Sequence, residues 1–157
     1  MGRIPRHSLP DGYFHVFARG VRGRGIFRDD GDRAAFLSLL SACEPRPAWV
    51  CHAFSLLSTH YHLVLEATRE NLSVGLHRLN GCYARRCNKR HGLFGHVFAE
   101  RISARRIDGE EYLYDACEYV VLNSVRAWLC GRVEDWPWSY SRFGLAATPP
   151  GARPSGP

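Results

Sequence analysis

The chain has 157 residues, a mass of 17.8 kDa and a formal net charge of +6, with 45% hydrophobic and 23% charged residues. This length accommodates about one domain, and the composition is that of a folded globular protein and not of a disordered one. No apolar run approaches the ~18 residues that span a bilayer. The N-terminus has no apolar core followed by a small-residue cleavage site. We therefore expect a cytoplasmic protein without a membrane segment.

The positive charge is carried almost entirely by arginine, because Lys89 is the only lysine among 21 basic residues. The planar donor groups of arginine suit phosphate, so the balance fits a nucleic-acid partner. A GC-rich genome favours arginine codons and would give the same excess of arginine over lysine. The six cysteines include no CxxC pair, which favours free thiols over disulfides. A zinc site from Cys82, Cys87 and a distant histidine stays an open alternative.

The first elements are a strand and a helix. Residues 13–19 are aromatic and β-branched and end at a glycine, which predicts a strand. Asp29, Asp30 and Asp32 are N-cap candidates for a helix over residues 33–44. The apolar residues of that helix recur at i, i+3, i+4 and i+7, which indicates one buried face.

A hairpin and a second, longer helix are predicted next. Residues 49–57 and 58–67 both have strand character, and a short turn near Ser58 would join them. Asn71 is a candidate cap for a helix over residues 72–90, which we expect to end near Gly92.

The last predicted elements are a strand over residues 96–107 and a third helix over residues 112–129. Asp108, with Glu111 three residues later, resembles a capping box that would open this helix. The stretch 146–157 is rich in Pro, Gly, Ala and Ser, which predicts a disordered tail after a single domain over residues 1–145.

The predicted order is strand, helix, strand, strand, helix, strand, helix. Helices joined to a hairpin-rich sheet indicate an α+β fold with an antiparallel sheet in one layer. A ferredoxin-like, or RRM-like, arrangement with helices packed on the sheet is the simplest topology.

His60-Tyr61-His62 is the sharpest local motif. Side chains alternate along a strand, so His60 and His62 point to the same face and could share one metal ion. Two histidines on a solvated strand face are the more frequent outcome for an isolated pair. Imidazole suits several transition metals, and a hard ion such as Mg²⁺ would need oxygen ligands as well.

A second motif lies in the third helix, where Tyr119 and Asn123 are four residues apart and therefore share one face. Tyr114, with Glu118 at the same spacing, is the competing pair. From the helix alone, a half-buried aromatic with a hydrogen-bonded hydroxyl is the favoured interpretation of Tyr119.

A third feature is a set of basic residues with the aromatic residues Tyr83, Phe94 and Phe98 among them. Charge that follows a phosphate backbone, with rings that stack on bases, is typical of single-strand binding. A solvated helix face with core aromatics is an equally weighted alternative. The basic set consists of Arg85, Arg86, Lys89, Arg90, Arg101, Arg105 and Arg106.

Taken in order, these segments resemble the REP-associated tyrosine transposases, a branch of the single-tyrosine HUH transposases of insertion-sequence type. The resemblance covers residues 3–143. GYFHVFARG resembles the opening strand, HAFSLLSTHYHLVLE the metal-ligand strand and EYVVLNSVRAWL the nucleophile helix. DWPWSY at residues 135–140 resembles the C-terminal signature of this branch. The chain departs from the family at Ser58-Thr59, where Pro-Asn is usual, and at Ser124, where proline is usual.

The resemblance implies that Tyr119 attacks single-stranded DNA next to a hairpin, forming a 5′-phosphotyrosyl ester and a free 3′-OH. It further implies that His60, His62 and Asn123 hold a divalent metal, Mg²⁺ or Mn²⁺. By analogy with its branch, a monomer is favoured over a dimer. Trp136, Trp138 and Tyr140 are candidates for DNA contacts, and packing of the C-terminal segment on the sheet explains them equally well.

Two alternatives stay open at this point. The chain could be a catalytically inactive, domesticated module that binds single-stranded nucleic acid. It could also be a metal-dependent phosphodiesterase that forms no covalent intermediate.

Overall fold

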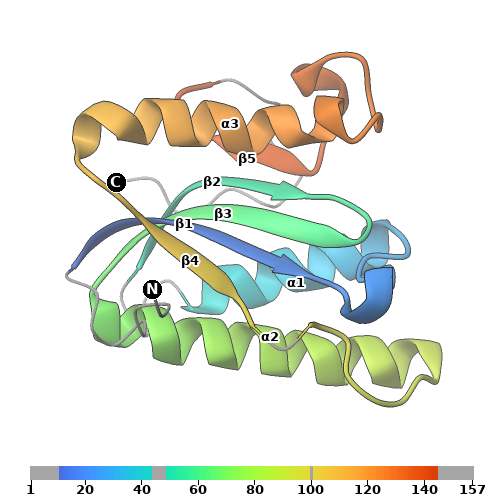
Figure 1. Cartoon of the computed structure of the whole chain (residues 1–157). Coiled ribbons are helices and arrows are strands. Elements are labelled where there is room, and N and C mark those ends of the chain that lie inside the picture. The colour runs from blue at the N-terminus through green and yellow to red at the C-terminus, as the bar shows by residue number, and fades with distance from the viewer. Residues whose placement is uncertain (1–10, 44–48, 100, 145–157) are drawn as a thin grey trace.

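A five-stranded antiparallel sheet forms the centre of the protein, which we describe from a computed structural model covering residues 11–43, 49–99 and 101–144 (Figure 1). The strand order is β4-β1-β3-β2-β5, and every neighbouring pair is antiparallel. The first four strands follow the ferredoxin-like order, and β5 is added at the β2 edge. The strands are β1 (Gly12–Arg19), β2 (Val50–Leu56), β3 (His60–Ala67), β4 (Ser103–Ile107) and β5 (Ser139–Ser141).

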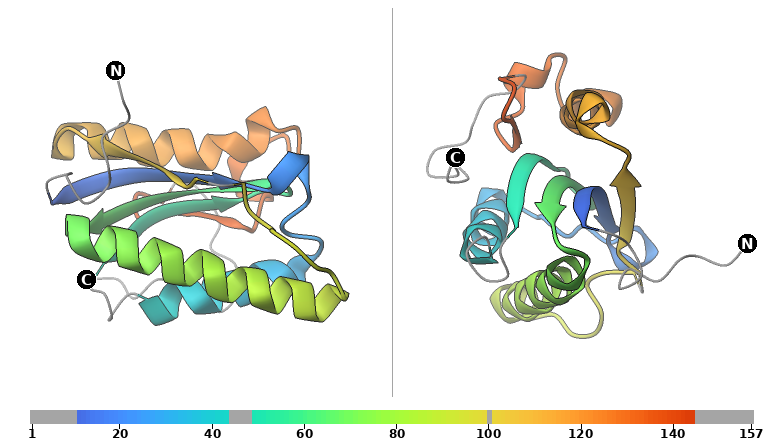
Figure 2. Two further views of the ribbon diagram at one scale, coloured as in Figure 1. Left: turned by 60° about the horizontal axis from the view of Figure 1, so that its bottom comes forward. Right: turned by 90° about the vertical axis from the view of Figure 1, so that its left-hand side faces the viewer.

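The three helices divide between the two faces of the sheet. Helices α1 (Asp30–Cys43) and α2 (Arg69–His91) cover one face, and α3 (Leu113–Arg126) lies across the other (Figures 1 and 2). The expected α+β fold, an antiparallel sheet with helices packed on it, is therefore confirmed. Short 3₁₀ turns occur at Val21–Gly23, Glu110–Tyr112 and Val133–Asp135.

The two faces carry cores of different size. The face under α1 and α2 buries most of the large side chains, including Phe14, Phe36 and Tyr61. The face under α3 buries a small cluster of Ala53, Val64, Ile107, Leu113, Cys117 and Val120. Because apolar burial dominates stability, the α1 and α2 face supplies most of the folding energy, and polar residues can collect on the other.

Helix caps agree with the sequence at some ends and not at others. Asp29 accepts a hydrogen bond from the Asp32 amide at 3.0 Å, as an N-cap does. The prediction that Asn71 caps α2 is wrong, because Thr68 is the cap and the Asn71 amide donates to its hydroxyl at 3.2 Å. The C-terminal end near Gly92 is confirmed by the left-handed φ of 63° there.

The region before α3 also differs from expectation. Only residues 103–107 of the predicted strand 96–107 pair in the sheet, apart from a single bridge between Phe98 and Gly20. Neither Asp108 nor Glu111 caps α3 with its side chain, so the predicted capping box is wrong. Gly109 has φ 113°, which turns the chain so that a 3₁₀ turn precedes the helix.

The sequence did not predict the fifth strand. Ser139–Ser141 is only three residues long and follows two tryptophans and a proline, so its local pattern is weak. Its pairing with β2 supplies what the pattern lacks. The predicted tail 146–157 lies outside the described residues. None of the described helices combines the length and apolar character that a membrane span requires.

Candidate active site on the α3 face of the sheet

The strand register brings three histidines to the α3 face. His62 on β3 pairs with Phe17 on β1, and His15 pairs with the next residue on the same face, Val64. His60 lies two residues before His62, so its side chain leaves the strand on the same side. The two histidines predicted from the sequence therefore share a face, and β1 adds a third.

The His62 ring contacts the rings of both His15 and His60. The His15 and His62 rings stack at 5.2 Å between centroids, and His15 Nε2 lies 3.0 Å from His62 Nδ1. The His60 and His62 rings meet edge to face at 5.3 Å. The Thr59 hydroxyl lies 3.1 Å from His60 Nδ1. Each predicted ligand histidine thus uses Nδ1 for a protein contact and keeps Nε2 for another partner.

Burial keeps these rings neutral. It lowers the pKa of His62 to about 3, reinforced by His15, His60 and Arg126. Burial also lowers the pKa of His60. Burial, followed by the nearby charge of Arg105, lowers the pKa of His15. A neutral imidazole has a lone pair available for a metal ion, which a protonated one does not.

Tyr119 descends from α3 onto this cluster. Its ring centroid is 5.6 Å from that of His15 and 6.3 Å from that of His62. The side chain is 46% exposed, and its hydroxyl forms no hydrogen bond with any described residue. The guanidinium of Arg126 lies 4.5 Å from the ring centroid, on the same helix. The sequence-based expectation that Tyr119 is hydrogen-bonded through its hydroxyl is not what the structure shows.

The competing tyrosine lies elsewhere. Tyr114 contacts Phe143 at 5.2 Å between ring centroids, near β5. A five-residue separation on a helix turns the two side chains by about 140° from each other, so Tyr114 and Tyr119 cannot serve one site. Between the two, the structure brings Tyr119 to the histidines.

Asn123 is buried one turn after Tyr119, with 9% of its surface exposed. Its amide nitrogen donates to the backbone carbonyls of Tyr119 at 2.9 Å and Val120 at 3.4 Å. These bonds hold the amide against its own helix and leave Oδ1 available as a metal-ligand atom. No contact joins Asn123 to His60 or His62 among the interactions described.

The side chains of His60, His62 and Asn123 are chemically suited to a divalent metal, although no contact among the described residues joins Asn123 to either histidine. Two Nε2 atoms and the Asn123 amide oxygen are neutral ligands of the kinds that transition metals accept. Three other possible ligand atoms, from Asp32, Cys87 and His91 on the α1 and α2 face, lie within 4.8 Å of one another. Because Arg90 and His91 already bind the Asp32 carboxylate, this second group is a paired network. Of the two cysteines considered for a zinc site from the sequence, this network contains Cys87 but not Cys82.

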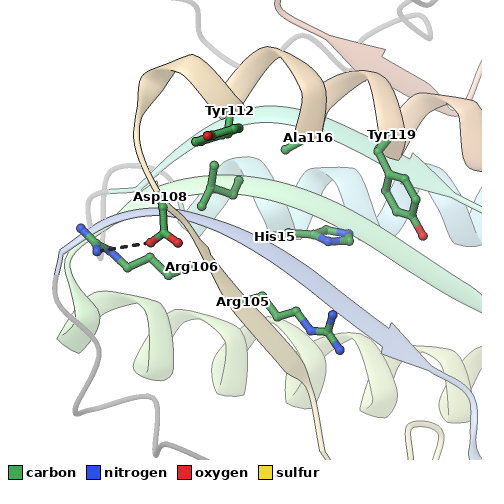
Figure 3. Close-up of a pocket in the computed structure, with 8 residues that line it drawn as sticks. His15, Arg105, Arg106, Asp108, Tyr112, Ala116 and Tyr119 are labelled. Atoms are coloured by element: carbon green, nitrogen blue, oxygen red, sulfur yellow. Dashed lines mark ion pairs between the residues drawn. The ribbon is translucent and has the colours of Figure 1, made fainter.

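Two pockets open beside Tyr119. The larger, of about 780 Å³, lies between β4 and α3 (Figure 3). The smaller, of about 230 Å³, reaches His62 and Phe17. His15, Arg105 and Tyr119 line both. Figure 3 shows the Tyr119 ring extending from α3 toward the strand that carries His15. A ligand in these pockets can therefore contact Tyr119 together with His15 and His62.

The predicted basic residues divide between two parts of the molecule. Arg105 and Arg106 lie on β4 and line the larger pocket. Arg85, Arg86, Lys89 and Arg90 lie on α2, which packs on the opposite face of the sheet (Figure 2). Arg101 is exposed between α2 and β4. The set is therefore not one continuous strip.

Several of the expected nucleic-acid contacts have structural partners. Arg90 forms ion pairs with Asp29 and Asp32. Tyr83 is buried and donates its hydroxyl to the Ile26 carbonyl, so the interpretation of this ring as a stacking platform is wrong.

The C-terminal aromatics pack on the protein. Trp136 donates its indole N–H to the Leu56 carbonyl at 3.1 Å. Trp138 packs against the larger core, as does Tyr140, which stacks on Phe54 at 5.7 Å. These contacts support the packing alternative raised from the sequence.

Two site residues were missed by the sequence analysis. His15 belongs to no local motif, and its role appears only when β1 pairs with β3. Arg126 lies seven residues after Tyr119, which is two helical turns, and this spacing could have indicated a shared face.

The fold and site together define a class of protein: a ferredoxin-like sheet that presents a histidine pair to a tyrosine on a crossing helix. The comparisons agree with this class at the level of the fold. A structure described as a REP-associated tyrosine transposase bound to a REP hairpin matches with a TM-score of 0.72 and 15% identity, covering 88% of this chain and 82% of that one. A candidate transposase of Deinococcus radiodurans R1 matches with a TM-score of 0.50 and 15% identity, covering 78% of this chain and 97% of that one.

The resemblance predicted from the sequence is thus confirmed for the fold over most of the chain. At 15% identity these matches carry the architecture and not the chemistry. No family model and no curated protein matches the sequence.

Proposed function

We propose that this protein is a tyrosine transposase of the REP-associated kind, which cuts and rejoins hairpin-bearing single-stranded DNA. The observation that carries the proposal is that the Tyr119 ring lies against the rings of His15 and His62, with His60 beside His62, while its hydroxyl has no hydrogen-bond partner among the described residues. Similarity in fold to a transposase bound to a REP hairpin supports the choice of substrate.

Tyr119 is the proposed nucleophile. Its Oη forms a bond to phosphorus as the P–O3′ bond breaks, so the 5′ phosphate stays on the protein and the 3′ oxygen leaves as a hydroxyl. The phenolic proton passes to water. Because one phosphoester replaces another, a new 3′-OH can reverse the step and join strands without ATP.

His60, His62 and Asn123 are the proposed holders of Mg²⁺ or Mn²⁺, the first two through Nε2 and the third through Oδ1. A bound divalent ion polarises the phosphate and stabilises charge on its non-bridging oxygens. His15 is a proposed positioning residue, because its contact with His62 Nδ1 orients that ring and leaves Nε2 for the metal. Arg105 and Arg106 are proposed DNA contacts, since both line the pocket beside Tyr119.

Detection of a phosphotyrosyl adduct tests this function. The protein is incubated with Mn²⁺ and single strands that carry hairpins, and the products are separated under denaturing conditions. We expect a protein-linked DNA band that EDTA suppresses. Cut DNA without such a band would instead identify a phosphodiesterase, and binding without cleavage would identify an inactive module.

A further inference from the structure

The larger pocket extends well beyond Tyr119. It runs between β4 and α3 with a volume of about 780 Å³ (Figure 3). Tyr119, His15 and Arg105 lie at one end, and the ring of Tyr112 lies toward the other. The attack of Tyr119 on one phosphate does not require a pocket of this length.

The two ends differ in charge. Arg105 forms no ion pair or hydrogen bond with any described residue, so its charge is available next to Tyr119. Arg106 lies 3.7 Å from the carboxylate of Asp108, and this pair is nearly neutral as a unit. An anionic group is therefore favoured at the Tyr119 end, and a neutral group at the far end.

The far end is suited to an aromatic ring. Tyr112 is 53% exposed and makes no ring contact with another described aromatic residue. Ile107 and Ala116 also line the pocket and are apolar. A flat, partly apolar ligand can stack on Tyr112 while its charged portion stays near Arg105.

We propose that this pocket holds one unstacked nucleotide of single-stranded DNA, with its phosphate at Arg105 and its base on Tyr112. The inference rests on the proposed function, since it takes DNA as the ligand of the same site. It adds a place for the nucleotide adjoining the attacked phosphate, and it assigns Tyr112 as the stacking residue.

Binding of two probes separates base from phosphate contacts. Full-length protein carrying Tyr119→Phe, without divalent metal, is titrated into fluorescein-labelled (dT)₈ and into an octamer of abasic nucleotides. Tyr112→Ala should weaken binding of (dT)₈ by about 5- to 150-fold, the range for loss of one stacked base. The abasic octamer should bind both proteins equally, because it has no base to stack.

Arg105→Gln should weaken both probes by the same factor and reduce the salt dependence of binding by about one phosphate contact. Tyr112→Phe keeps the ring and should retain the affinity for (dT)₈. Tyr114→Ala is the matched control, since Tyr114 lies two residues further along, at the start of α3, and is 44% exposed but contacts Phe143. The Tyr114→Ala substitution should leave the affinities for (dT)₈ and for the abasic octamer unchanged.

Two failures are distinguishable. If (dT)₈ binds but Tyr112→Ala leaves its affinity unchanged, or weakens the abasic probe equally, the nucleotide pocket is refuted while strand cleavage stands. If neither probe binds the protein, the nucleotide pocket is likewise refuted, and the proposed function is decided separately by adduct formation with hairpin DNA and Mn²⁺.

Discussion

Asp32 on one face of the sheet and Tyr119 on the other differ in how far their polar atoms are paired. Under α1 and α2, Asp32 is 2% exposed, and it accepts hydrogen bonds from the Arg28 amide, Arg90 and His91. Tyr61 likewise donates to Asn80 at 2.7 Å. Under α3, the Tyr119 hydroxyl has no partner among the described residues.

This difference indicates that Asp32 contributes to stability, whereas Tyr119 is available for chemistry. A buried polar group with all its partners stabilises one arrangement, and a group left without them is available to a ligand. The face that carries Asp32 also has the larger apolar core, so the fold can maintain an incompletely paired tyrosine on its smaller one.

The largest expected effect is on the α3 face. Tyr119→Phe removes the proposed nucleophile and should abolish the covalent adduct, while the ring and the binding of DNA are retained. Denaturing gels with labelled hairpin DNA measure this. Tyr114→Phe is the matched control and should leave adduct formation unchanged. An adduct formed by the Tyr119→Phe protein would shift the assignment to another residue.

Loss of a proposed metal ligand should come next. His60→Ala should lower the cleavage rate at fixed Mn²⁺ by at least about 10- to 100-fold, because a neutral imidazole donor is lost. Mn²⁺ should support cleavage at lower concentration than Mg²⁺, since two imidazoles suit a hard, oxygen-seeking ion poorly. Rates measured across metal concentration test both statements. Equal rates for wild type and His60→Ala would remove His60 from the site.

His15 should act through His62. His15→Ala should weaken Mn²⁺ binding by about 10- to 100-fold, as expected when a partner of a ligand imidazole is lost. Electron paramagnetic resonance measures the Mn²⁺ affinity of the variant directly, without a cleavage reaction. His15→Gln can still accept a hydrogen bond and should recover part of the loss.

His52→Gln is the control for this series. His52 is 3% exposed on the same sheet, and its ring bonds Glu66 at 2.9 Å and Arg142 at 2.8 Å, not His62. Its Mn²⁺ affinity should match that of the wild type. A loss as large as that of His15→Ala would mean that the effect is general destabilisation.

The smallest expected effect lies on the α1 and α2 face. Burial would raise the pKa of Asp32, but hydrogen bonds from Arg28, Arg90 and His91 hold it below 3.8. Its stabilising contribution is therefore present above about pH 4 and lost as the pH falls through the lower pKa of the folded state.

Asp32→Asn should thus lower the free energy of unfolding by about 1–3 kcal/mol at neutral pH. It should also make stability less sensitive to acid below pH 4. Denaturant unfolding at several pH values measures both. If the variant loses stability toward acid as steeply as wild type does, Asp32 is not the titrating group.

Much of the fold was readable in the sequence because its signals are local. The strand character of residues 58–67 indicates β3, and the glycine at position 92 marks the end of α2. The ends were harder where several residues compete, as with Thr68 and Asn71, because one residue of difference changes little in local propensity. The strand Ser139–Ser141 was missed because pairing with β2, and not its own composition, stabilises it.

The sequence by itself determined that His60 and His62 share a face and that Tyr119 lies on a helix, since strand and helix periodicities depend only on spacing. Tertiary contacts were needed to show that Tyr119, and not Tyr114, lies against His62, and that His15 contacts the same ring. They were also needed to show that the basic residues of α2 lie on the other side of the sheet. Register and helix packing set these relations, and both depend on contacts between residues far apart in the chain.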